Sequence, residues 1–372
     1  MSEEIILYRG PLERARLKLL LTSVLSRQHS KVTFVWIFPK VLDATKKKHF
    51  YDFINQFNLE HVHIYRDNGL KAFEIRKEIK QFFGSRNFEI AHYIGFKSYF
   101  YASAVVAFKK VWYVNGIPEE MLLNGATITN RTKCFLNWFL VKIQQKPDLI
   151  VTVSQPMKEH VKRKTFDTNY FITPITVDNV TFTNSNKPKK YLTYLGSGAA
   201  WQAIDLLEAL WYEISLLDKN AIFRVISRDK RCDLLGKRIP KESINFCSSS
   251  DFNEVAAFLS ESKMGFLLRR NHIVNNVSFP TKYAEYVASG AFVALSDIEW
   301  DLNTYVKEYK TGILVDPTAP LKETAKNIVS FLDHNANALH HSNFEASTQA
   351  LSNKYWVGKL NERLNELVLD NH

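Results

Sequence analysis

The sequence has few cysteines, no long apolar run and none of several familiar catalytic motifs. Cys134, Cys232 and Cys247 are widely spaced in 372 residues, and an odd, sparse set excludes a disulfide framework and a zinc site. No apolar run reaches the roughly 18–20 residues that a membrane-spanning helix needs. A Walker loop, a Gly-x-Gly-x-x-Gly fingerprint, a metal-ligand cluster and a nucleophile elbow are also missing. We therefore expect neither a metal nor a resident cofactor.

The first residues, Met-Ser-Glu-Glu, are acidic, unlike the basic start and apolar stretch of a secretory signal. We therefore expect a soluble cytoplasmic protein. Hydrophobic residues make up 46% of the chain and charged residues 23%, which is ordinary for a globular protein and excludes a disordered one. At roughly 100–200 residues per domain, the length favours two domains.

Positive charge is concentrated in the first half of the chain. Residues 1–180 hold 27 Lys and Arg against 16 Asp and Glu, whereas residues 181–372 hold 22 of each. Such an asymmetry indicates that the first half meets a polyanion or an anionic membrane, although a solvated basic surface has the same composition. The sequence contains no recognised nucleic-acid-binding module, which argues against a nucleic-acid partner.

Short apolar runs alternate with helix-length amphipathic segments along the whole chain. This alternation predicts an α/β protein whose parallel sheets are covered on both faces. The expected strands are 5–8, 32–38, 61–65, 90–94, 110–114, 149–153, 170–173, 191–195, 221–226, 244–247, 264–268 and 292–296. The expected helices include 12–27, 46–57, 70–83, 131–145, 204–217, 252–261, 281–289 and 321–333.

A polar stretch with a proline, residues 183–190, has the composition of a linker between two strand-like runs. We therefore expect two doubly wound domains, residues 1–182 and 190–352, that face a central cleft, followed by a final segment, 353–372. In open α/β sheets, ligands bind beyond the carboxyl ends of the strands.

The most specific stretch ends in Pro280-Thr-Lys-Tyr-Ala-Glu-Tyr-Val-Ala-Ser-Gly290. Pro280 and Thr281 suit the start of a helix, with Thr281 as N-cap, and Gly290 suits its end. Lys282 and Glu285 share one face of the first turn. A helix N-terminus with a lysine attracts phosphate, and a carboxylate one turn on accepts two ribose hydroxyls. The pattern describes a sugar-nucleotide site, although an amphipathic helix with an exposed Lys–Glu pair also fits it.

This stretch resembles the donor-binding segment of GT-B glycosyltransferases, especially family 4 (glycosyl transferases group 1) and bacterial envelope-polysaccharide glycosyltransferases. A Pro-x-Lys-x-x-Glu-Tyr-x-Ala-x-Gly run is common there. The resemblance implies that Glu285 holds the donor ribose and that Lys282 holds the phosphates and serves catalysis. Many members carry a Glu-x7-Glu pair, and Val277 stands at its first position. Three polar neighbours are candidates to replace that carboxylate: Asn275, Asn276 and Ser278.

The resemblance extends over most of the chain, through residues 150–160, 170–178, 194–207, 312–317 and 355–360. The last of these resembles a family helix that crosses back onto the first domain. Gly196, Ser197 and Gly198 let the backbone approach a phosphate closely. Family members usually have an arginine and a lysine where this chain has Ser197 and Gln202. The cations expected to replace this clamp are Arg228, Arg269, Arg270 and Lys282.

The first half carries the candidates for acceptor binding. Arg9, Gly10 and Arg14 follow the first expected strand, where they would bind an anionic acceptor or form a solvated helix face. Asn115-Gly-Ile-Pro-Glu-Glu120 resembles the Arg-Gly-x-x-Pro-Glu-Glu turn of some envelope glycosyltransferases, with Asn115 in place of arginine. Asn115 and Glu120 are therefore candidate acceptor ligands.

Two further residues of this half are candidate catalytic groups. Glu119 adjoins Glu120 and is expected to face the cleft, although a helix N-terminus explains both glutamates equally well. His92 resembles a histidine of the acceptor-side cleft of the family, although a lone histidine is more often structural.

Residues 131–146 interleave aromatic and aliphatic residues with Arg131, Lys133, Lys142 and Lys146. A basic aromatic amphipathic helix can lie on an anionic membrane. It can also simply cover the first sheet, which is the interpretation that we favour from the sequence.

Together these features predict a GT-B glycosyltransferase with two Rossmann-like α/β domains. The second domain would bind a nucleotide-sugar, expected to be UDP-linked, as co-substrate. The basic first domain would bind a glycan or lipid-linked acceptor of envelope polysaccharide synthesis (capsule, O-antigen or similar), with peripheral contact at the inner face of the plasma membrane. The family resemblance implies a retaining, metal-independent reaction. The alternative is a catalytically inactive nucleotide-sugar or glycan-binding protein of the same fold.

Overall fold

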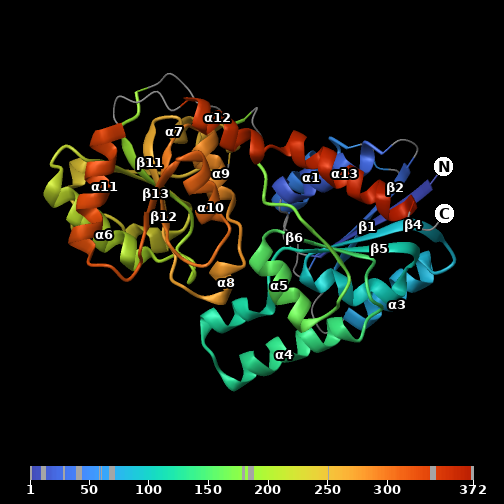
Figure 1. The fold of residues 1–372 in the computed structure, drawn as a ribbon. Helices are drawn as coiled ribbons and strands as arrows, with labels where there is room; N and C mark the ends of the chain where they lie inside the picture. The colour runs from blue at the N-terminus through green and yellow to red at the C-terminus, as the bar shows by residue number, and fades with distance from the viewer. Residues whose placement is uncertain are drawn as a thin grey trace. The chain divides into compact units, whose positions relative to one another are not determined.

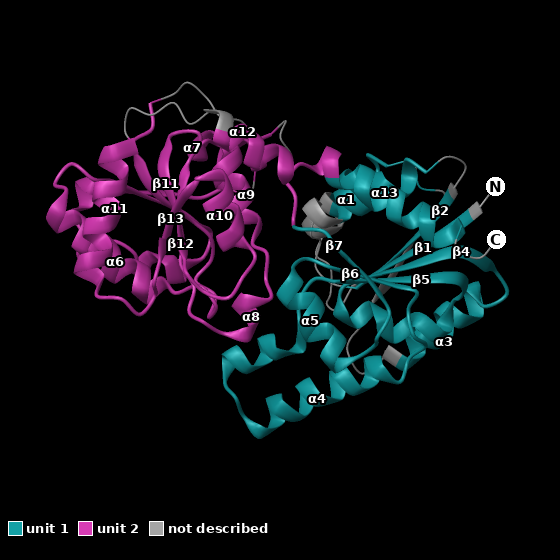
Figure 2. Ribbon diagram, viewed as in Figure 1, with its two compact units in different colours: residues 1–174, 356–372 teal, residues 175–355 magenta. Residues whose placement is uncertain are grey.

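The computed structural model divides the chain into two compact units, residues 1–174 with 356–372 (unit 1) and residues 175–355 (unit 2), which Figure 2 colours teal and magenta. The sequence placed the division between residues 182 and 190 and the start of the last segment at residue 353. The structure describes residues 2–9, 14–27, 30–38, 44–57, 59, 61–66, 72–177, 181–182, 188–249, 251–335 and 341–369.

The described part of unit 1 forms a parallel sheet of seven strands in the order β3-β2-β1-β4-β5-β6-β7 (Figure 1). Its strands are β1 (Ser2–Arg9), β2 (Ser30–Phe38), β3 (His61–Arg66), β4 (Asn87–Ile94), β5 (Val106–Val114), β6 (Leu149–Thr152) and β7 (Asn169–Ile172). In the register of the sheet, Ile6 lies opposite Phe34 on one side and His92 on the other. The strand order reverses at β1 and β4, and ligands of doubly wound sheets bind at such a switch point.

Helices connect these strands and cover the sheet. They are α1 (Arg14–Leu25), α2 (Ala44–Ile54), α3 (Ala72–Phe83), α4 (Ile128–Lys142), α5 (Gln155–Lys164) and α13 (Asn353–Leu369), with the 3-10 helices η1 (Phe96–Ala104) and η2 (Pro118–Asn124). Thr127 caps α4, since its side chain accepts a hydrogen bond from the Asn130 N–H at 3.2 Å. The helix therefore begins at Ile128, three residues before the expected start.

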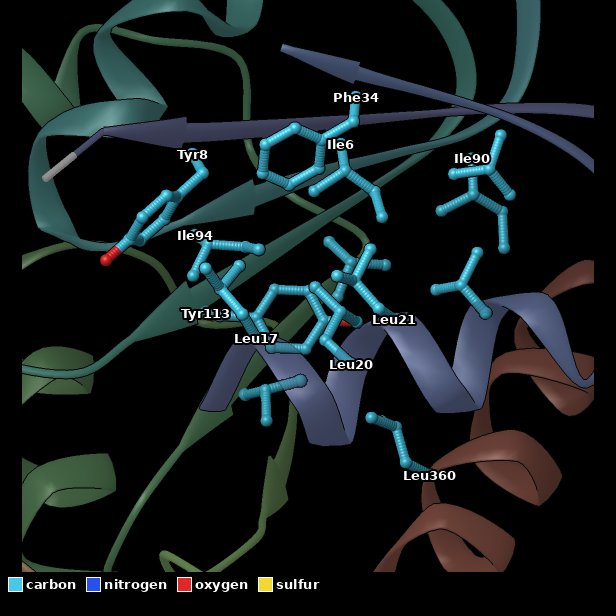
Figure 3. Close-up of a cluster of buried hydrophobic side chains, with 14 of the residues drawn as sticks. Ile6, Tyr8, Leu17, Leu20, Leu21, Phe34, Ile90, Ile94, Tyr113 and Leu360 are labelled. Carbon is cyan, nitrogen blue, oxygen red and sulfur yellow. The ribbon is translucent and has the colours of Figure 1, made fainter. Parts of the chain in front are cut away.

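The core of unit 1 joins the two ends of the chain. Figure 3 shows Leu17, Leu20 and Leu21 of α1 packed with Leu360 of α13 and with side chains of the strands. Ile5 and Leu7 as well as Ile6 are fully buried, because helices cover both faces of the sheet. A strand buried on both faces is continuously apolar rather than alternating.

Unit 2 has the order β10-β9-β8-β11-β12-β13 in a parallel sheet of six described strands. The strands are β8 (Tyr191–Leu195), β9 (Ile222–Ile226), β10 (Ile244–Cys247), β11 (Ser262–Leu267), β12 (Phe292–Ser296) and β13 (Gly312–Val315). The helices are α6 (Ile204–Leu217), α7 (Phe252–Leu259), α8 (Ile273–Asn276), α9 (Thr281–Ala288), α10 (Leu302–Tyr309), α11 (Leu321–Asn335) and α12 (His341–Ala350), with η3 (Lys230–Leu234) and η4 (Lys241–Ser243).

An aromatic cluster fixes α6 on this second sheet. The Trp211 ring centroid lies 5.0 Å from that of Phe223 and 5.7 Å from that of Phe266. Burial of such large rings contributes strongly to stability.

The predicted α/β class with two doubly wound sheets is confirmed. Among the described helices, none combines the length and apolar character needed to cross a bilayer.

Candidate functional site

A cavity of about 290 Å³ lies in unit 2 at the carboxyl ends of β8 and β9, beside the N-terminus of α9. This is the edge of a doubly wound sheet at which ligands bind. The cavity is lined by Leu195, Gly196, Ile226, Ser227, Arg228, Ser249, Asp251, Phe252, Val255, Thr281, Lys282 and Glu285. The structure therefore brings four of the expected donor residues to one cavity: Gly196, Arg228, Lys282 and Glu285.

The N-terminus of α9 carries no side-chain cap. The expectation that Thr281 caps the helix was wrong, because Thr281 is already its first residue and Pro280 occupies the cap position. The first turn of a helix leaves N–H groups without intrahelical partners, and these groups bind anions. At the other end, Gly290 has a φ of 71°, a conformation that glycine adopts readily after a helix.

Lys282 and Glu285 project from this first turn into the cavity, and both are only half-buried by surface area. Within the described part of the chain, neither side chain forms a hydrogen bond or an ion pair. Burial, reinforced by the nearby cation Arg269, lowers the pKa of Lys282 to about 8, while Glu285 opposes the shift. Burial also raises the pKa of Glu285, and Lys282 opposes it. Each charge is thus poorly solvated and lacks a close partner.

Arg269 is a second cation near this cavity and, unlike Lys282, it is almost fully buried. Its side chain is 3% exposed, and one guanidinium nitrogen donates to the Trp201 carbonyl oxygen at 2.8 Å. Its Nε has no partner in the described structure. Burial lowers the pKa of Arg269 to about 10, with Tyr194 opposing. Because a buried cation is costly without a counter-charge, Arg269 and Lys282 together favour an anion.

The absence of a side chain at Gly196 makes room for the side chains of Tyr194 and Lys282. A Cβ there would lie 2.6 Å from the Tyr194 hydroxyl oxygen and 3.0 Å from Cε of Lys282. The Tyr194 hydroxyl donates to the Ser197 carbonyl oxygen at 2.7 Å, which holds the turn. The Gly198 N–H donates to the Asp229 carboxylate at 3.0 Å. The expectation that Ser197 and Gly198 approach a phosphate is therefore corrected, since neither lines the cavity and that N–H is already engaged.

The expected cations do not all meet at the cavity. Arg228 is exposed and lines it. Arg270, in contrast, forms a bidentate ion pair with Asp205 of α6, at 2.9 and 2.5 Å, and both side chains are exposed. Its assignment to the phosphate clamp is therefore corrected: its guanidinium is held by a surface carboxylate outside the cavity.

The polar residues around Val277 hold their own loop together. The Asn275 side-chain amide donates to the Arg270 carbonyl oxygen at 2.8 Å, and the Ser278 hydroxyl donates to the Asn275 carbonyl oxygen at 2.7 Å. Asn276 donates to the side chain of Asn271 at 2.8 Å. None of the three lines the cavity, and Val277 itself is buried. The three side chains that were expected to replace the carboxylate are thus bonded within their own loop rather than lining the cavity.

A second cavity, of about 340 Å³, lies in unit 1 at the carboxyl ends of β1, β4 and β5. It is lined by Tyr8, Arg9, Gly95, Phe96, Lys97, Asn115, Gly116, Ile117, Pro118, Glu120, Met121 and Asn137. Three expected acceptor residues, Arg9, Asn115 and Glu120, therefore share it. The Arg9 guanidinium lies 6.0 Å from the centroid of the Phe100 ring and 5.8 Å from that of the Tyr101 ring. Gly10 and the side chain of Arg14 lie outside the described residues.

His92 does not face this cavity. It is fully buried in β4, and its Nε2 lies 2.8 Å from a carboxylate oxygen of Glu4, while its Nδ1 lies 3.0 Å from the Tyr113 hydroxyl. Arg27 completes the group with an ion pair to Glu4 at 2.5 Å. The placement of His92 in an open cleft is therefore corrected, since the ring is part of a buried polar network.

Glu119 is buried as well, and its expected cleft-facing position is corrected. Its carboxylate accepts a hydrogen bond from the Trp138 indole N–H at 3.0 Å, and Nε2 of His160 lies 3.1 Å from the same oxygen. Burial raises the pKa of Glu119, but hydrogen bonds from His160, from its own backbone N–H and from Trp138, together with the electrostatic effect of His160, outweigh it, so the pKa is lowered overall. Through these two contacts the carboxylate of Glu119, in η2, links η2 to Trp138 of α4 and to His160 of α5 inside unit 1.

Sequence reasoning missed several cavity residues, including Lys97 in unit 1 and Ser227, Ser249 and Phe252 in unit 2. The signal that would have found them is positional. Each follows the carboxyl end of a strand, which is where doubly wound folds bind ligands. In the described residues, no group of three or more His, Cys, Asp and Glu side chains is placed to hold a metal.

No protein-family profile matches the sequence. No curated protein matches it either. Many solved structures share its fold. Sucrose-phosphate synthase from Thermosynechococcus elongatus has a TM-score of 0.73 at 12% sequence identity, with 100% of both chains covered. Anabaena HepE in complex with UDP and glucose has a TM-score of 0.72 at 10% identity, covering 98% of this chain and 100% of HepE. The lipopolysaccharide outer core galactosyltransferase WaaB has a TM-score of 0.66 at 11% identity, with 100% of both chains covered.

These likenesses span whole chains, so they extend to both doubly wound units. They define the class of the fold: the chain has the GT-B fold of glycosyltransferases, as its sequence predicts. The identities of 10–12% establish the architecture, and the residues of the two cavities must carry the argument for function.

Proposed function

We propose that the protein is a glycosyltransferase that moves a sugar from a nucleotide-activated donor to a glycan or lipid-linked acceptor. Unit 2 binds the donor, and unit 1 binds the acceptor in the cavity that Arg9, Asn115 and Glu120 line. We further propose that the donor is UDP-linked and is a co-substrate rather than a resident cofactor.

One observation carries the proposal: Lys282 and Glu285 line the same cavity at a helix N-terminus, and among the described residues neither has a hydrogen-bonding or ionic partner and the terminus has no side-chain cap. Lys282 and the first-turn N–H groups suit a diphosphate. Glu285, one turn further along, suits a pair of ribose hydroxyls, since a carboxylate accepts two hydrogen bonds. A nucleoside diphosphate carries both groups.

The same residues suit catalysis of transfer. As the bond from the sugar to the diphosphate breaks, negative charge develops on the leaving oxygen. Lys282, Arg269 and the N-terminus of α9 would stabilise that charge from fixed positions. We therefore propose a reaction that draws this stabilisation from the chain's own cations, without a metal ion. The resemblance to family 4 supports retention of the anomeric configuration.

The proposed acceptor is a glycan or lipid-linked glycan of envelope polysaccharide synthesis, made at the cytoplasmic face of the membrane. The resemblance of the Asn115–Glu120 turn to that of envelope glycosyltransferases supports it. The lipopolysaccharide galactosyltransferase among the structural neighbours agrees with this class of acceptor, and the UDP and glucose of HepE agree with the donor class.

A second candidate is a nucleotide-sugar-binding protein of this fold that no longer transfers the sugar. The buried Val277 motivates it, because this position commonly carries a carboxylate in the family. This candidate predicts donor binding without turnover.

The test is a thermal-shift panel of UDP-, GDP-, CMP- and dTDP-sugars on the full chain. A ligand that binds only the folded state raises the melting temperature. We expect a rise with the UDP-sugars, its reduction in Lys282→Ala and Glu285→Gln, and no reduction in the exposed control Lys219→Ala. Slow release of UDP in the absence of acceptor would distinguish the enzyme from the binding protein. If no nucleotide-sugar raises the melting temperature, the proposal is wrong.

A further inference from the structure

The outer side of α4 exposes apolar side chains that a soluble helix normally buries. In Figure 1, α4 lies on the outside of unit 1. Six large apolar residues of α4 and the residue after it keep between 37% and 85% of their surface exposed. They are Ile128, Phe135, Leu136, Phe139, Leu140 and Ile143. We call this set of residues the α4 face.

The opposite side of the helix is firmly packed, so the exposure is fixed by the fold. Cys134, Trp138 and Val141 are buried. The Trp138 indole donates to Glu119 at 3.0 Å, and its ring centroid lies 4.8 Å from that of Phe96. At about 100° of rotation per residue, most of the α4 face points away from this buried side. The helix covers the sheet with one side and presents the other to its surroundings.

The most prominent part of the α4 face is an aromatic pair. Phe135 and Phe139 are one helical turn apart, their ring centroids lie 6.4 Å apart, and their planes are inclined by 15°. Two parallel exposed rings on one turn present a flat apolar surface, and such a patch marks an interaction site.

Along α4 itself and the residues just beyond it, the charges that flank this surface are all positive. Arg131, Lys133, Lys142 and Lys146 are all exposed, and residues 121–147 contain no Asp or Glu. By helical rotation, Arg131 and Lys142 lie on one side of the α4 face and Lys133 lies on the other. The apolar strip is thus bordered by cations along both edges.

We propose that the α4 face docks on an anionic lipid bilayer. The phenylalanine and leucine side chains would enter the boundary between headgroups and acyl chains, while the flanking cations meet the lipid phosphates. Lysine stems also contribute apolar contact while their ammonium groups stay among the headgroups. This proposal does not depend on the proposed sugar transfer, since none of these residues lines the cavity of unit 2 that is proposed to bind the nucleotide-sugar.

Charge favours a bilayer over a second copy of the chain. Two α4 faces in contact would bring the four cations of each copy, eight in all, together without an acidic partner from either α4, which is repulsive. An anionic bilayer supplies the missing negative charge over the whole surface. The helix lies along such a surface rather than across it, because only one of its sides is apolar.

The experiment measures binding of the full chain to vesicles of equimolar phosphatidylcholine and phosphatidylglycerol, with phosphatidylcholine vesicles for comparison. We expect binding to the anionic vesicles that weakens as salt is raised. The double variant Phe135→Ser, Phe139→Ser should weaken binding by about tenfold or more for each ring removed, since each buried ring contributes that order of affinity. The triple variant Lys133→Glu, Lys142→Glu, Lys146→Glu should weaken it by about fivefold or more for each position.

Matched controls come from exposed residues of unit 2. Leu216→Ser with Phe246→Ser removes two exposed apolar side chains, and a triple reversal of Lys219, Lys237 and Lys241 to Glu changes the same charge. Both controls should bind vesicles like the wild type. All variants should retain the wild-type melting temperature, because the changed side chains are exposed, and the melting temperature of each variant is measured beside its binding.

Three results would overturn the proposal. The first is that the wild-type chain fails to bind anionic vesicles, and the second is that the α4 variants bind these vesicles as tightly as their controls do. In the third, the wild-type chain is a dimer in solution that the Phe135→Ser, Phe139→Ser variant converts to a monomer, which assigns the face to a second copy.

Discussion

The affinity for a nucleoside diphosphate should fall as the pH rises through about 8, the pKa that burial gives to Lys282. Besides burial, three neighbouring groups act on this lysine: Arg269 lowers its pKa, whereas Glu285 and Cys232 raise it. Bound phosphate would add a strong negative charge beside the ammonium and raise the pKa in the complex. The complex therefore keeps its proton at a pH where the free protein has lost it.

The size of the effect follows from the protonation of the free protein. One pH unit above a pKa of about 8, only about one molecule in eleven still carries the proton on Lys282. The dissociation constant for UDP should therefore rise about tenfold between pH 7 and pH 9. The terminal phosphate of UDP is already about nine-tenths ionised at pH 7, since its second pKa is near 6, so its own titration changes the affinity little in this range.

The assay is calorimetric titration with UDP at pH 7, 8 and 9. Lys282→Met should bind more weakly at every pH and show little change between them. Lys282→Arg should bind at pH 9 about as well as at pH 7, because a guanidinium stays charged. The exposed control Lys219→Met should keep the wild-type slope. A wild-type affinity that is constant from pH 7 to 9 would refute the role of Lys282.

The same shift predicts a gain in stability when the charge is removed. In the unfolded chain Lys282 has its ordinary pKa of about 10.5, so between pH 8 and 10.5 the unfolded state binds more protons. The free energy of unfolding therefore rises with pH across that window. Below pH 8 Lys282 is charged in both states, and the whole cost of burying its charge lowers the stability of the fold. Lys282→Met should raise the melting temperature of the ligand-free protein at pH 7 while weakening UDP binding.

Three other substitutions test the remaining assignments. Glu285→Gln should weaken UDP binding by about 1–3 kcal/mol, as for a charged hydrogen bond lost, and should leave the affinity for inorganic pyrophosphate unchanged. Arg270→Ala should alter UDP affinity less than twofold by calorimetry, because Asp205 holds this guanidinium outside the cavity. Glu119→Ala should destabilise the fold by about 3–5 kcal/mol in denaturant titration, because it leaves His160 without its buried partner. An Arg270 variant that loses UDP binding, or a Glu119 variant with wild-type stability, would contradict these placements.

The strands and the Lys282–Glu285 pair could be predicted because their signals are local. The run 191–195 is apolar and bounded by polar residues, and the structure places β8 at the same residues. Lys282 and Glu285 share one helical turn, so their spacing alone brings them to one surface. The strand β13 at residues 312–315 was not predicted, although the equally short run 244–247 was. A run of four residues shows no period, so its length alone does not decide between a strand and a loop.

The failures concern partners that are distant in the sequence. The sequence could not show that the Arg269 guanidinium is buried and donates to the Trp201 carbonyl oxygen. Nor could it show that the neighbouring Arg270 is exposed and pairs with Asp205 of α6. His92 is similar, because its partner Glu4 lies on another strand that the sheet places beside it. In each case, the sequence identifies the residue type and the three-dimensional packing decides its use.

The contribution of α13 to the core of unit 1 has a consequence for synthesis on the ribosome. Leu360, Leu364 and Leu367 pack against α1 and the first sheet, yet residues 175–355 are made in between. At roughly 5–20 residues per second, that interval lasts roughly 10–35 seconds. During it, the apolar side of α1 lacks its final cover, whereas unit 2 is continuous in sequence and can complete its own core. The half of the protein that is translated first is thus the last to be finished, and during that wait its uncovered leucines are the surface that a chaperone would bind.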